Sequence, residues 1–520
     1  MTGVTSSDQP STTAGFLRHW ATERPEHPAL RWADGQLTYG QLHERTSRVA
    51  QALRAAGVGP GSRVAFLDKN SPEQVELFFG AAKLNAVPCP VNYRLAPPEI
   101  AFIVADSEAP VFVVGEEFAP AIDKVADELP GVRVIVMGDE YEAWRDAHPA
   151  DDPDVPLVAG DVAYQLYSSG TTGRPKGVQL TQANLMAGMG LYPKIMGLGP
   201  DSVSMVPMPL YHIGGGGWAL AGFAQGATNV LIREIVPDRL VDTIVEDRVT
   251  HGFLVPAVLQ FMLAVPGVEN RDFSALKSLL YGASPISEKV LAASVRTFGC
   301  EFVQAYGLTE STGTVIYLPA ADHDPDGPNR HRLRAVGVPI PGSEAKVVDP
   351  TTGATVETGV VGEIWVKGPT VMAGYWHMPE QTEAAVTDGW LHTGDAGYQD
   401  ADGYFYIHDR VKDMIVSGGE NIYPAEVENV IMSHPDVADV AVIGVPHERW
   451  GETPRAMVVR VAGSGITETD LLAFCRERLA GFKCPTSVEW LDELPRNPSG
   501  KVLKKDLRAP FWEGRDRMVG

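Results

Sequence analysis

Short apolar runs that predict buried strands alternate with helix-period stretches through most of this chain. The predicted strands lie at 64–67, 111–114, 132–137, 162–166, 252–255 and 276–281, and the predicted helices at 73–84, 119–129 and from Pro256 and Pro285 onward. Proline is favoured in the first turn of a helix, which fits both of the last two starts. This alternation predicts a layered α/β fold.

The chain length requires more than one packed unit. A chain of 520 residues exceeds what one hydrophobic core supports, so at least two or three units are expected. The chain has 43 Lys and Arg residues against 66 Asp and Glu, a formal charge of −23. Such an acidic surface repels phosphate backbones, so no nucleic-acid partner is expected. Any phosphate site must therefore gather its positive charge locally.

The pattern changes near residue 395, where a second, smaller unit is predicted. Residues 397–406 predict two short strands around an Asp/Gly turn. A compact α+β pattern follows, with helices at 424–432 and 468–479 and strands at 440–443 and 457–461. We place the boundary at about residue 410, with a large domain at 1–410 and a small mobile lid at 411–520.

The longest stretch without a charged residue, 202–232, has the length of a membrane span. Pro207, Pro209, His212 and the glycine run 214–217 suit a spanning helix poorly, so no transmembrane segment is expected. We predict buried strand, loop and helix that line an apolar cavity. The four cysteines form no CxxC pair and the Ser/Thr-rich start resembles no signal peptide, which favours the cytoplasm.

The segment most specific for chemistry is YSSGTTGRPKG at 167–177. It follows the predicted strand 162–166 and precedes a helix start at Thr181. Its glycines let backbone N–H groups converge on oxygens, its four hydroxyls donate further bonds, and Lys176 supplies charge. No Walker A spacing is present. The segment therefore predicts a polyphosphate site of another kind than the P-loop.

This segment resembles the phosphate-binding motif of the adenylate-forming superfamily, which includes acyl-CoA synthetases, firefly luciferases and adenylation domains of peptide synthetases. Further motifs follow in the expected order: QAYGLTE at 304–310, GWLHTGD at 389–395, DRVKD at 409–413, SGGENIYP at 417–424 and PRNPSGK at 495–501. The resemblance covers about residues 15–510 and is strongest to bacterial fatty-acyl-CoA synthetases. It implies a large N-terminal domain of layered α/β sheets with a β-barrel-like part, and a small mobile α+β C-terminal domain.

The resemblance implies an acid:CoA ligase that uses ATP, Mg²⁺ and CoA. A carboxylate is a poor acyl electrophile, so it first attacks the α-phosphate of ATP, forms acyl-AMP and releases pyrophosphate. The acyl group then passes to the thiol of CoA. Negative charge accumulates on phosphorus oxygens in the transition state, so cations and oriented donors must be in place.

The resemblance also implies the roles of single residues in binding ATP. Those implied at the β- and γ-phosphates are Ser168, Ser169, Gly170, Thr171, Thr172, Gly173 and Lys176. Those implied at the adenosine and α-phosphate are Gly282, Ala283, Ser284, Gln304, Ala305, Tyr306, Gly307, Thr309, Asp395 and Arg410. Within this set Tyr306 is expected to stack on adenine, Thr309 to bond the α-phosphate, and Asp395 to bind both ribose hydroxyls.

The remaining catalytic roles concern the metal, a lysine and the lid. Glu310 is expected to bind Mg²⁺ as a hard oxygen ligand. Lys501 is expected to reach the carboxylate and α-phosphate as a point charge during adenylation. Lys412 is the expected hinge for rotation of the lid between half-reactions. Residues implied to line the CoA tunnel are Ser417, Gly418, Gly419 and Glu420. No base for the thiol is evident.

The acyl pocket is expected around the glycine run. Its predicted residues are His212, Gly214, Gly215, Gly216, Trp218 and Gly313, with His212 as a gate beside the acyl carbonyl. We expect the glycines to leave room for the acid. No Lys or Arg in these stretches neutralises a second carboxylate, and no acidic residue takes an amino group. A medium- or long-chain fatty acid is the first choice, and an aromatic or ring-bearing acid such as a benzoate, cinnamate or sterol-derived acid is the alternative.

Three other functions are weighed against this prediction. A fatty acyl-AMP ligase that loads a carrier protein typically carries an insertion, and none is apparent. A non-catalytic adenylate sensor predicts loss of Lys501, Glu310 or the phosphate loop, all of which are present. A luciferase-like oxygenase has no positive sign in the sequence. A homodimer and peripheral contact with a membrane are both compatible with the sequence.

Overall fold

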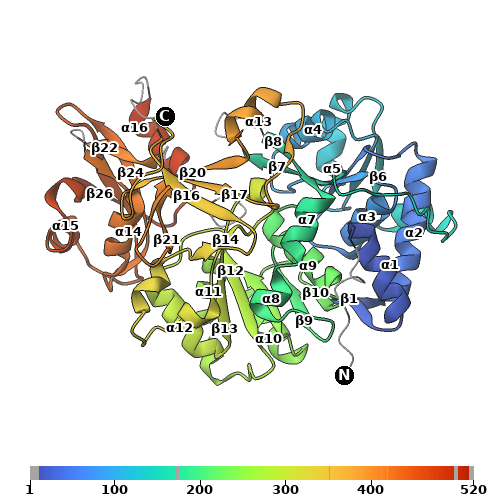
Figure 1. Cartoon of the computed structure of the whole chain (residues 1–520). Helices are drawn as coiled ribbons and strands as arrows, with labels where there is room; N and C mark the ends of the chain where they lie inside the picture. The colour runs from blue at the N-terminus through green and yellow to red at the C-terminus, as the bar shows by residue number, and fades with distance from the viewer. Residues whose placement is uncertain are drawn as a thin grey trace.

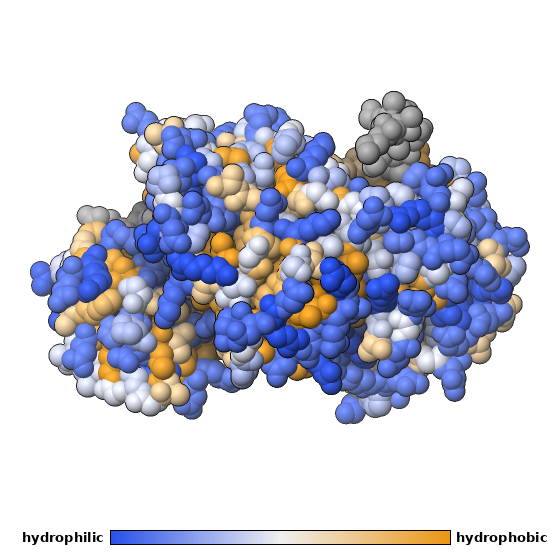
Figure 2. Space-filling view, turned by 90° about the horizontal axis from the view of Figure 1, so that it is seen from below, coloured by the Kyte–Doolittle hydropathy of each residue, from blue (hydrophilic) through white to orange (hydrophobic). Residues whose placement is uncertain are grey.

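The structure is a computed structural model that describes residues 11–169, 175–350, 352–410, 413–417, 420–496 and 502–513. Figure 1 shows an elongated molecule with the N-terminal elements at one end and the C-terminal elements at the other. Among the described residues the strands form five sheets. On the face shown in Figure 2, hydrophilic residues cover most of the surface and apolar residues form patches between them.

The largest sheet has a parallel centre. In spatial order its strands are β15 (Val338–Pro339), β14 (Ile316–Leu318), β13 (Glu301–Tyr306), β12 (Ser278–Gly282), β11 (His251–Leu254), β9 (Val203–Val206), β10 (Thr228–Leu231), β1 (Pro28–Trp32) and β2 (Gly35–Thr38). The strands from β13 to β1 pair in parallel, whereas β2, β14 and β15 are antiparallel at the edges. Continuous apolar runs suit such central strands because both faces of the sheet are covered.

A second, fully parallel sheet lies in the N-terminal part. Its order is β4 (Val87–Pro90), β3 (Arg63–Leu67), β5 (Val111–Val114) and β6 (Arg133–Val136). The strands predicted at 64–67, 111–114 and 132–137 are thereby confirmed. The helix predicted at 119–129 is not continuous, because α5 (Ala119–Ile122) gives way to a 3₁₀ turn at Asp123–Glu128. Asp123 and Asp127 would repel each other at the i,i+4 spacing of an α-helix.

Helices cover these sheets. They are α1 (Thr13–Glu23), α2 (Tyr39–Ala55), α3 (Pro72–Lys83), α4 (Pro97–Asp106), α6 (Asp139–Asp146), α7 (Gln182–Met189), α8 (Tyr192–Met196), α10 (Pro237–Glu246), α11 (Pro256–Leu263) and α12 (Glu288–Phe298). The starts predicted at Thr181 and Pro256 are confirmed. The start at Pro285 is wrong: α12 begins at Glu288 because the Ser287 side chain accepts a bond from the Val290 N–H and caps the helix.

The charge-free segment 202–232 is buried. It forms β9, a π-helical turn at Ile213–Gly217, α9 (Trp218–Ala224) and β10, as predicted. Together with Phe78, Phe79 and other apolar residues it lines a cavity of about 30 Å³, a volume that holds about one water molecule. No helix in the described ranges is both long and apolar enough to cross a membrane.

The middle of the chain adds two antiparallel sheets. The first joins β7 (Val162–Ser169), β8 (Pro175–Thr181) and β18 (Gly374–Tyr375). The second has the order β16 (Glu344–Val348), β17 (Gly362–Lys367), β20 (Trp390–Gln399) and β19 (Val386–Thr387), with β21 (Phe405–Arg410) also paired to β20 and α13 (Pro379–Ala385) leading into β19. A β-barrel-like part was expected in the large domain. The second sheet is the candidate for it, and the pairings among its described strands do not close into a barrel.

The C-terminal part has its own sheet and core. The sheet order is β23 (Glu420–Ile422), β22 (Ile415–Ser417), β25 (Gly451–Arg460) and β24 (Val437–His447), with β26 (Ser487–Leu491) on β25. Three helices, α14 (Pro424–Met432), α15 (Glu468–Arg476) and α16 (Lys504–Trp512), complete it. Apolar residues such as Ile415, Val427 and Val442 pack into a separate cluster. The chain passes from one sheet to the next between Arg410 and Ile415, and the domain boundary expected at 410 and 411 stays a prediction.

Candidate active site

The predicted phosphate segment connects the two strands of a hairpin, and its described residues lie at the end of β7 and the start of β8. Strands β7 and β8 pair so that Ser168 stands opposite Lys176. Gly170, Thr171, Thr172 and Gly173, with the side chain of Ser169, lie outside the described residues. Ser168 lies in β7 just before these residues, and Lys176 lies in β8 just after them; both are half-buried.

Glu310 lies against this hairpin. It belongs to a 3₁₀ turn at Thr309–Ser311, which follows β13 after Gly307 and Leu308. The Ser168 hydroxyl donates to Glu310 Oε1 over 3.4 Å, and the Tyr375 hydroxyl donates to the same oxygen over 3.0 Å. The structure therefore brings the predicted metal carboxylate and the phosphate hairpin together, although the motifs are about 140 residues apart.

Close backbone packing fixes the turn that carries Thr309 and Glu310. A Cβ atom at Gly307 would overlap the carbonyl oxygen of Gly313. Thr312 adopts a left-handed conformation with φ of 55°, which is uncommon for a β-branched residue. Strained backbone persists only where the surrounding contacts hold it, and it is enriched at functional sites.

The adenosine end of the predicted site is joined to the same strand. The Tyr306 hydroxyl, at the end of β13, donates to Asp395 Oδ2 over 2.7 Å. Asp395 is only 7% exposed, and its backbone pairs with that of Arg410 in β21. The side chain of Arg410 lies outside the described residues. Tyr306 and Asp395, both expected at the adenosine, are thus in contact, and the stacking role of Tyr306 and the ribose role of Asp395 stay predictions.

The predicted adenine wall is made by neighbouring strands. Gly282 pairs with Ala305 across β12 and β13. Ala283 is exposed and has a φ of 67°, so the chain turns sharply just after β12. Gln304 is 8% exposed and lies 3.5 Å from the hydroxyl of buried Tyr281. Its amide therefore faces the interior, and Ala283, Ser284 and Ala305 are the more accessible members of the wall.

The glycine run does not provide the room that we expected from it. A Cβ atom at Gly215 would overlap the carbonyl oxygen of Pro209, and one at Gly216 would overlap that of Leu210. At Gly214 it would press on the ring of Phe253. The expectation of open space is therefore wrong at these positions, because the glycines allow the π-helical turn to pack tightly.

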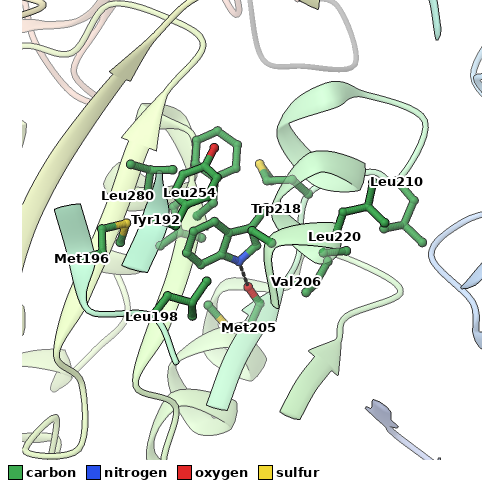
Figure 3. Packing of buried hydrophobic residues seen from close by; sticks show 14 of the residues in the cluster. Tyr192, Met196, Leu198, Met205, Val206, Leu210, Trp218, Leu220, Leu254 and Leu280 are labelled. Carbon is green, nitrogen blue, oxygen red and sulfur yellow. Dashed lines mark hydrogen bonds between the residues drawn. The ribbon is translucent and has the colours of Figure 1, made fainter. Parts of the chain in front are cut away.

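Trp218 also departs from its predicted place. Figure 3 shows its indole packed among Tyr192, Met196, Leu198 and further apolar side chains, with the ring N–H donating to the Met205 carbonyl over 3.0 Å. The side chain is 2% exposed. Trp218 therefore belongs to the hydrophobic core. His212, by contrast, is half-buried, and its carbonyl accepts the N–H groups of Gly215 and Gly216 at the start of the π-helical turn.

Gly313 keeps its place in the predicted acyl region. A Cβ built on it would lie 3.5 Å from Ile213 of the π-helical turn, so the two stretches named for the pocket do meet. The nearby Phe253 ring adds an apolar wall. Apolar side chains thus lie beside both Gly214 and Gly313.

The predicted residues of the lid are only partly described. Lys412, Gly418, Gly419 and Lys501 lie outside the described residues, as does the side chain of Glu420. Ser417 pairs with Glu420 and with Gly451 through its backbone. The hinge, the catalytic lysine and the CoA tunnel therefore stay predictions.

The donors near the hairpin suit a magnesium ion that is shared with a triphosphate. Within the described ranges no group of three or more His, Cys, Asp or Glu side chains could form a metal cage. Mg²⁺ commonly takes one or two carboxylates and completes its shell with substrate phosphates and water. Glu310 beside the hairpin fits the carboxylate expected for Mg²⁺, and Lys176 fits the expected local positive charge; both roles stay predictions.

Motif reasoning missed one residue of this site, Tyr375. It lies in β18, which pairs with β8, and its hydroxyl contacts Glu310 while Lys176 Nζ lies 4.8 Å from its ring centre. The signal available in the sequence was the run Gly374-Tyr375-Trp376, in which two large aromatic residues follow a glycine outside the predicted motifs.

Comparisons with known proteins show the family of the chain. A family model described as AMP-binding enzyme matches residues 17–376, and one described as AMP-binding enzyme C-terminal domain matches residues 426–501. The fatty acid–[acyl-carrier-protein] ligase ScoC of Streptomyces coeruleorubidus is 42% identical over 507 residues, which cover 96% of both chains. A feruloyl-CoA synthase of an Amycolatopsis species is 40% identical and covers 95% of this chain and 99% of its own.

Among solved structures, ATP-bound MatB from Rhodopseudomonas palustris superimposes with a TM-score of 0.89 at 31% identity, over 96% of this chain and 99% of its own. The agreement extends over both parts of the molecule. The chain therefore belongs to the AMP-binding enzymes of the adenylate-forming superfamily, and it is an AMP-forming acid–thiol ligase.

Proposed function

We propose that this protein activates an uncharged, apolar carboxylic acid with MgATP as acyl-AMP and then transfers the acyl group to CoA. A medium- or long-chain fatty acid is the first choice. The observation that carries the proposal is that one short segment, 304–310, contacts both ends of a nucleotide site. Tyr306 contacts Asp395 at one end, and Glu310 contacts Ser168 at the other.

In the first half-reaction ATP lies along this segment. Asp395, fixed by Tyr306, accepts bonds from the ribose hydroxyls. Ser168 and Lys176 contact the outer phosphates, and Glu310 holds a magnesium ion that neutralises charge on them. A carboxylate oxygen of the acid bonds to the α-phosphorus, the bond to the bridging oxygen breaks, and pyrophosphate departs.

The second half-reaction requires movement of the lid. The thiol of CoA loses a proton and attacks the acyl carbonyl, and AMP departs with the electron pair of the broken C–O bond. Lys501 serves only the first step, rotation about Lys412 removes it, and Ser417–Glu420 then line the entry of CoA. The separate sheet and core of the C-terminal part support its movement as a body.

The apolar residues near the π-helical turn support an uncharged acid. Segment 202–232 contains no charged residue; within it Ile213 lies beside Gly313, and Gly214 lies beside the Phe253 ring. A second carboxylate or an amino group would be buried there without a partner, at a cost of several kcal/mol. Two acid classes remain: the fatty acids named for ScoC, and ring-bearing acids such as the one named for feruloyl-CoA synthase.

The acyl acceptor has a second candidate as well. ScoC is named for transfer to an acyl carrier protein, so a carrier protein is the alternative to CoA. Both present the same phosphopantetheine thiol, and they differ in what surrounds it. We also infer a cytoplasmic location, where ATP and CoA are supplied together.

A panel assay tests the proposal. The purified protein receives MgATP and single acids of 6 to 18 carbons, benzoates, cinnamates, malonate and amino acids, and pyrophosphate release is measured. CoA and a holo acyl carrier protein are then compared as acceptors for the best acid. The expected result is acid-dependent pyrophosphate release, followed by a thioester and AMP. ATP binding without AMP formation from any acid would contradict the proposal and favour a sensor.

A further inference from the structure

One tyrosine joins two residues of the proposed ATP site. The hydroxyl of Tyr375 donates to Glu310 Oε1 over 3.0 Å, and its ring lies 4.8 Å beneath Lys176 Nζ. Glu310 comes from the turn after β13 and Lys176 from β8. A single side chain on β18 therefore contacts the proposed metal ligand and the proposed phosphate lysine at once.

We propose that Tyr375 is a positioning residue for the metal-bound triphosphate. Its hydroxyl fixes one oxygen of Glu310 and leaves the other for the metal, while its ring holds the ammonium of Lys176 toward the phosphates. The inference rests on the proposed roles of Glu310 and Lys176. Groups that bond a ligating carboxylate orient it and tune its affinity for the metal.

The backbone on both sides of Tyr375 is held in place. Its N–H donates to the Thr382 hydroxyl over 2.9 Å, and its strand pairs with β8 at Val178. The next residue, Trp376, donates its backbone N–H to the Gly177 carbonyl over 2.7 Å and its indole N–H to the Asp106 carbonyl over 2.9 Å. The phenol therefore projects from a rigid strand, as a positioning group requires.

The segment around Tyr375 also holds the main chain of the metal-ligand turn. The Met372 N–H donates to the Glu310 carbonyl over 2.8 Å, and the Thr312 hydroxyl donates to the Thr370 carbonyl over 2.6 Å. Backbone and side chain of Glu310 are thus both bonded by residues 372–375. The turn that carries Thr309 and Glu310 is tied to the phosphate hairpin through this segment.

Two contacts of different kinds define the proposed role of Tyr375. Its hydroxyl is a hydrogen-bond donor to the Glu310 carboxylate. Its ring face attracts the Lys176 ammonium by a cation–π interaction.

The test is direct binding of Mn²⁺, used as a paramagnetic substitute for Mg²⁺, measured by electron paramagnetic resonance with α,β-methylene-ATP and no acid. Tyr375→Phe removes the hydroxyl and keeps the ring. It is expected to raise the dissociation constant for Mn²⁺ about tenfold, the lower end of what outer-shell changes cost. Tyr404→Phe is the matched control, because Tyr404 also donates to a carboxylate, Asp322, over 2.7 Å, away from this site.

Two further variants separate the parts of the proposal. Tyr375→Leu also removes the ring, so it is expected to raise KM for ATP beyond the effect of Tyr375→Phe. Ser168→Ala removes the other hydroxyl on Glu310 Oε1, whose bond is longer at 3.4 Å, and is expected to weaken Mn²⁺ binding less. Melting temperatures of all variants confirm that they fold.

The outcomes distinguish this inference from the proposed function beneath it. Unchanged Mn²⁺ affinity in Tyr375→Phe, with a clear loss in Glu310→Gln, would overturn the role of Tyr375 alone. Unchanged affinity in Glu310→Gln would instead overturn the metal role of Glu310. Equal losses in Tyr375→Phe and Tyr404→Phe would assign the effect to general destabilisation and also overturn the inference.

Discussion

Replacing Tyr306 by Phe tests the adenosine end of the site. The change removes the hydroxyl that donates to Asp395 Oδ2 over 2.7 Å and keeps the ring. Asp395 is 7% exposed, so water replaces the lost donor poorly. A hydrogen bond to a charged group contributes about 1.5–3 kcal/mol. At about 1.4 kcal/mol per tenfold change, the full loss corresponds to a factor of about 10 to 150.

This loss is expected to appear in the use of ATP. If Asp395 binds the ribose, its displacement lowers kcat/KM for ATP by about 10- to 150-fold and leaves KM for the acid nearly unchanged. The assay is initial-rate pyrophosphate release with ATP and the acid varied separately. The variant is also expected to discriminate less between ATP and 2′-deoxy-ATP, because the group that contacts the hydroxyl is no longer fixed.

A double-mutant cycle with Asp395→Asn gives the decisive control. If the two residues act through one hydrogen bond, the double variant loses little more kcat/KM for ATP than the more impaired single variant. Additive losses in the cycle, or a kcat/KM for ATP within twofold of the parent in Tyr306→Phe, would refute the reasoning. A parallel rise in KM for the acid would show that the phenol acts on the acyl region instead.

Three further predictions follow. Lys501→Ala is expected to cripple adenylation and spare thioester formation from supplied acyl-AMP; equal loss in both half-reactions would contradict its assigned role. Lys412→Pro is expected to spare pyrophosphate release and stall thioester formation, so unchanged overall turnover would remove the hinge. Burial lowers the pKa of Lys83 from 10.5 to about 7, against the opposing effect of Asp152 3.5 Å away. Between these values the unfolded state binds more protons, so the stability contribution of Lys83 increases with pH from 7 to 10.5. Urea unfolding of the parent and Lys83→Met at pH 7 and 9 measures it: an equal change with pH in both proteins would contradict the assignment.

Much of the fold could be predicted because its strands are short apolar runs bounded by polar turns. The runs at 64–67, 111–114 and 252–255 coincide with β3, β5 and β11 to within one residue. Errors arose where local chemistry decided the boundary. Ser287 offers a better cap than the neighbourhood of Pro285, and the acidic pair at 123 and 127 disfavours an α-helix.

Some residues of the candidate site lie in recognisable motifs, and Tyr375 does not. Motifs identify groups that contact the ligand, and the structure brings Ser168, Glu310, Tyr306 and Asp395 together in two contacts. Tyr375 was not predicted because it lies in none of the recognised motifs; its contacts are with Glu310 and Lys176. A residue that holds another residue leaves no spacing pattern of its own when the two come from distant strands.

The glycine run shows a different limit of sequence reasoning. A missing side chain is needed equally where a ligand approaches and where backbone packs against backbone. At Gly215 and Gly216 an added Cβ atom would overlap the carbonyl oxygens of Pro209 and Leu210, so these glycines serve backbone packing. At Gly313 an added Cβ atom would lie at ordinary contact distance from Ile213. Substitution by alanine is expected to lower the melting temperature at Gly215, where backbone must move, and to strain the backbone at Gly313, whose φ is 91°. Under the proposed function the size of the acid is therefore expected to depend on the groups near Ile213 and Phe253, because the number of glycines in the run does not measure open space.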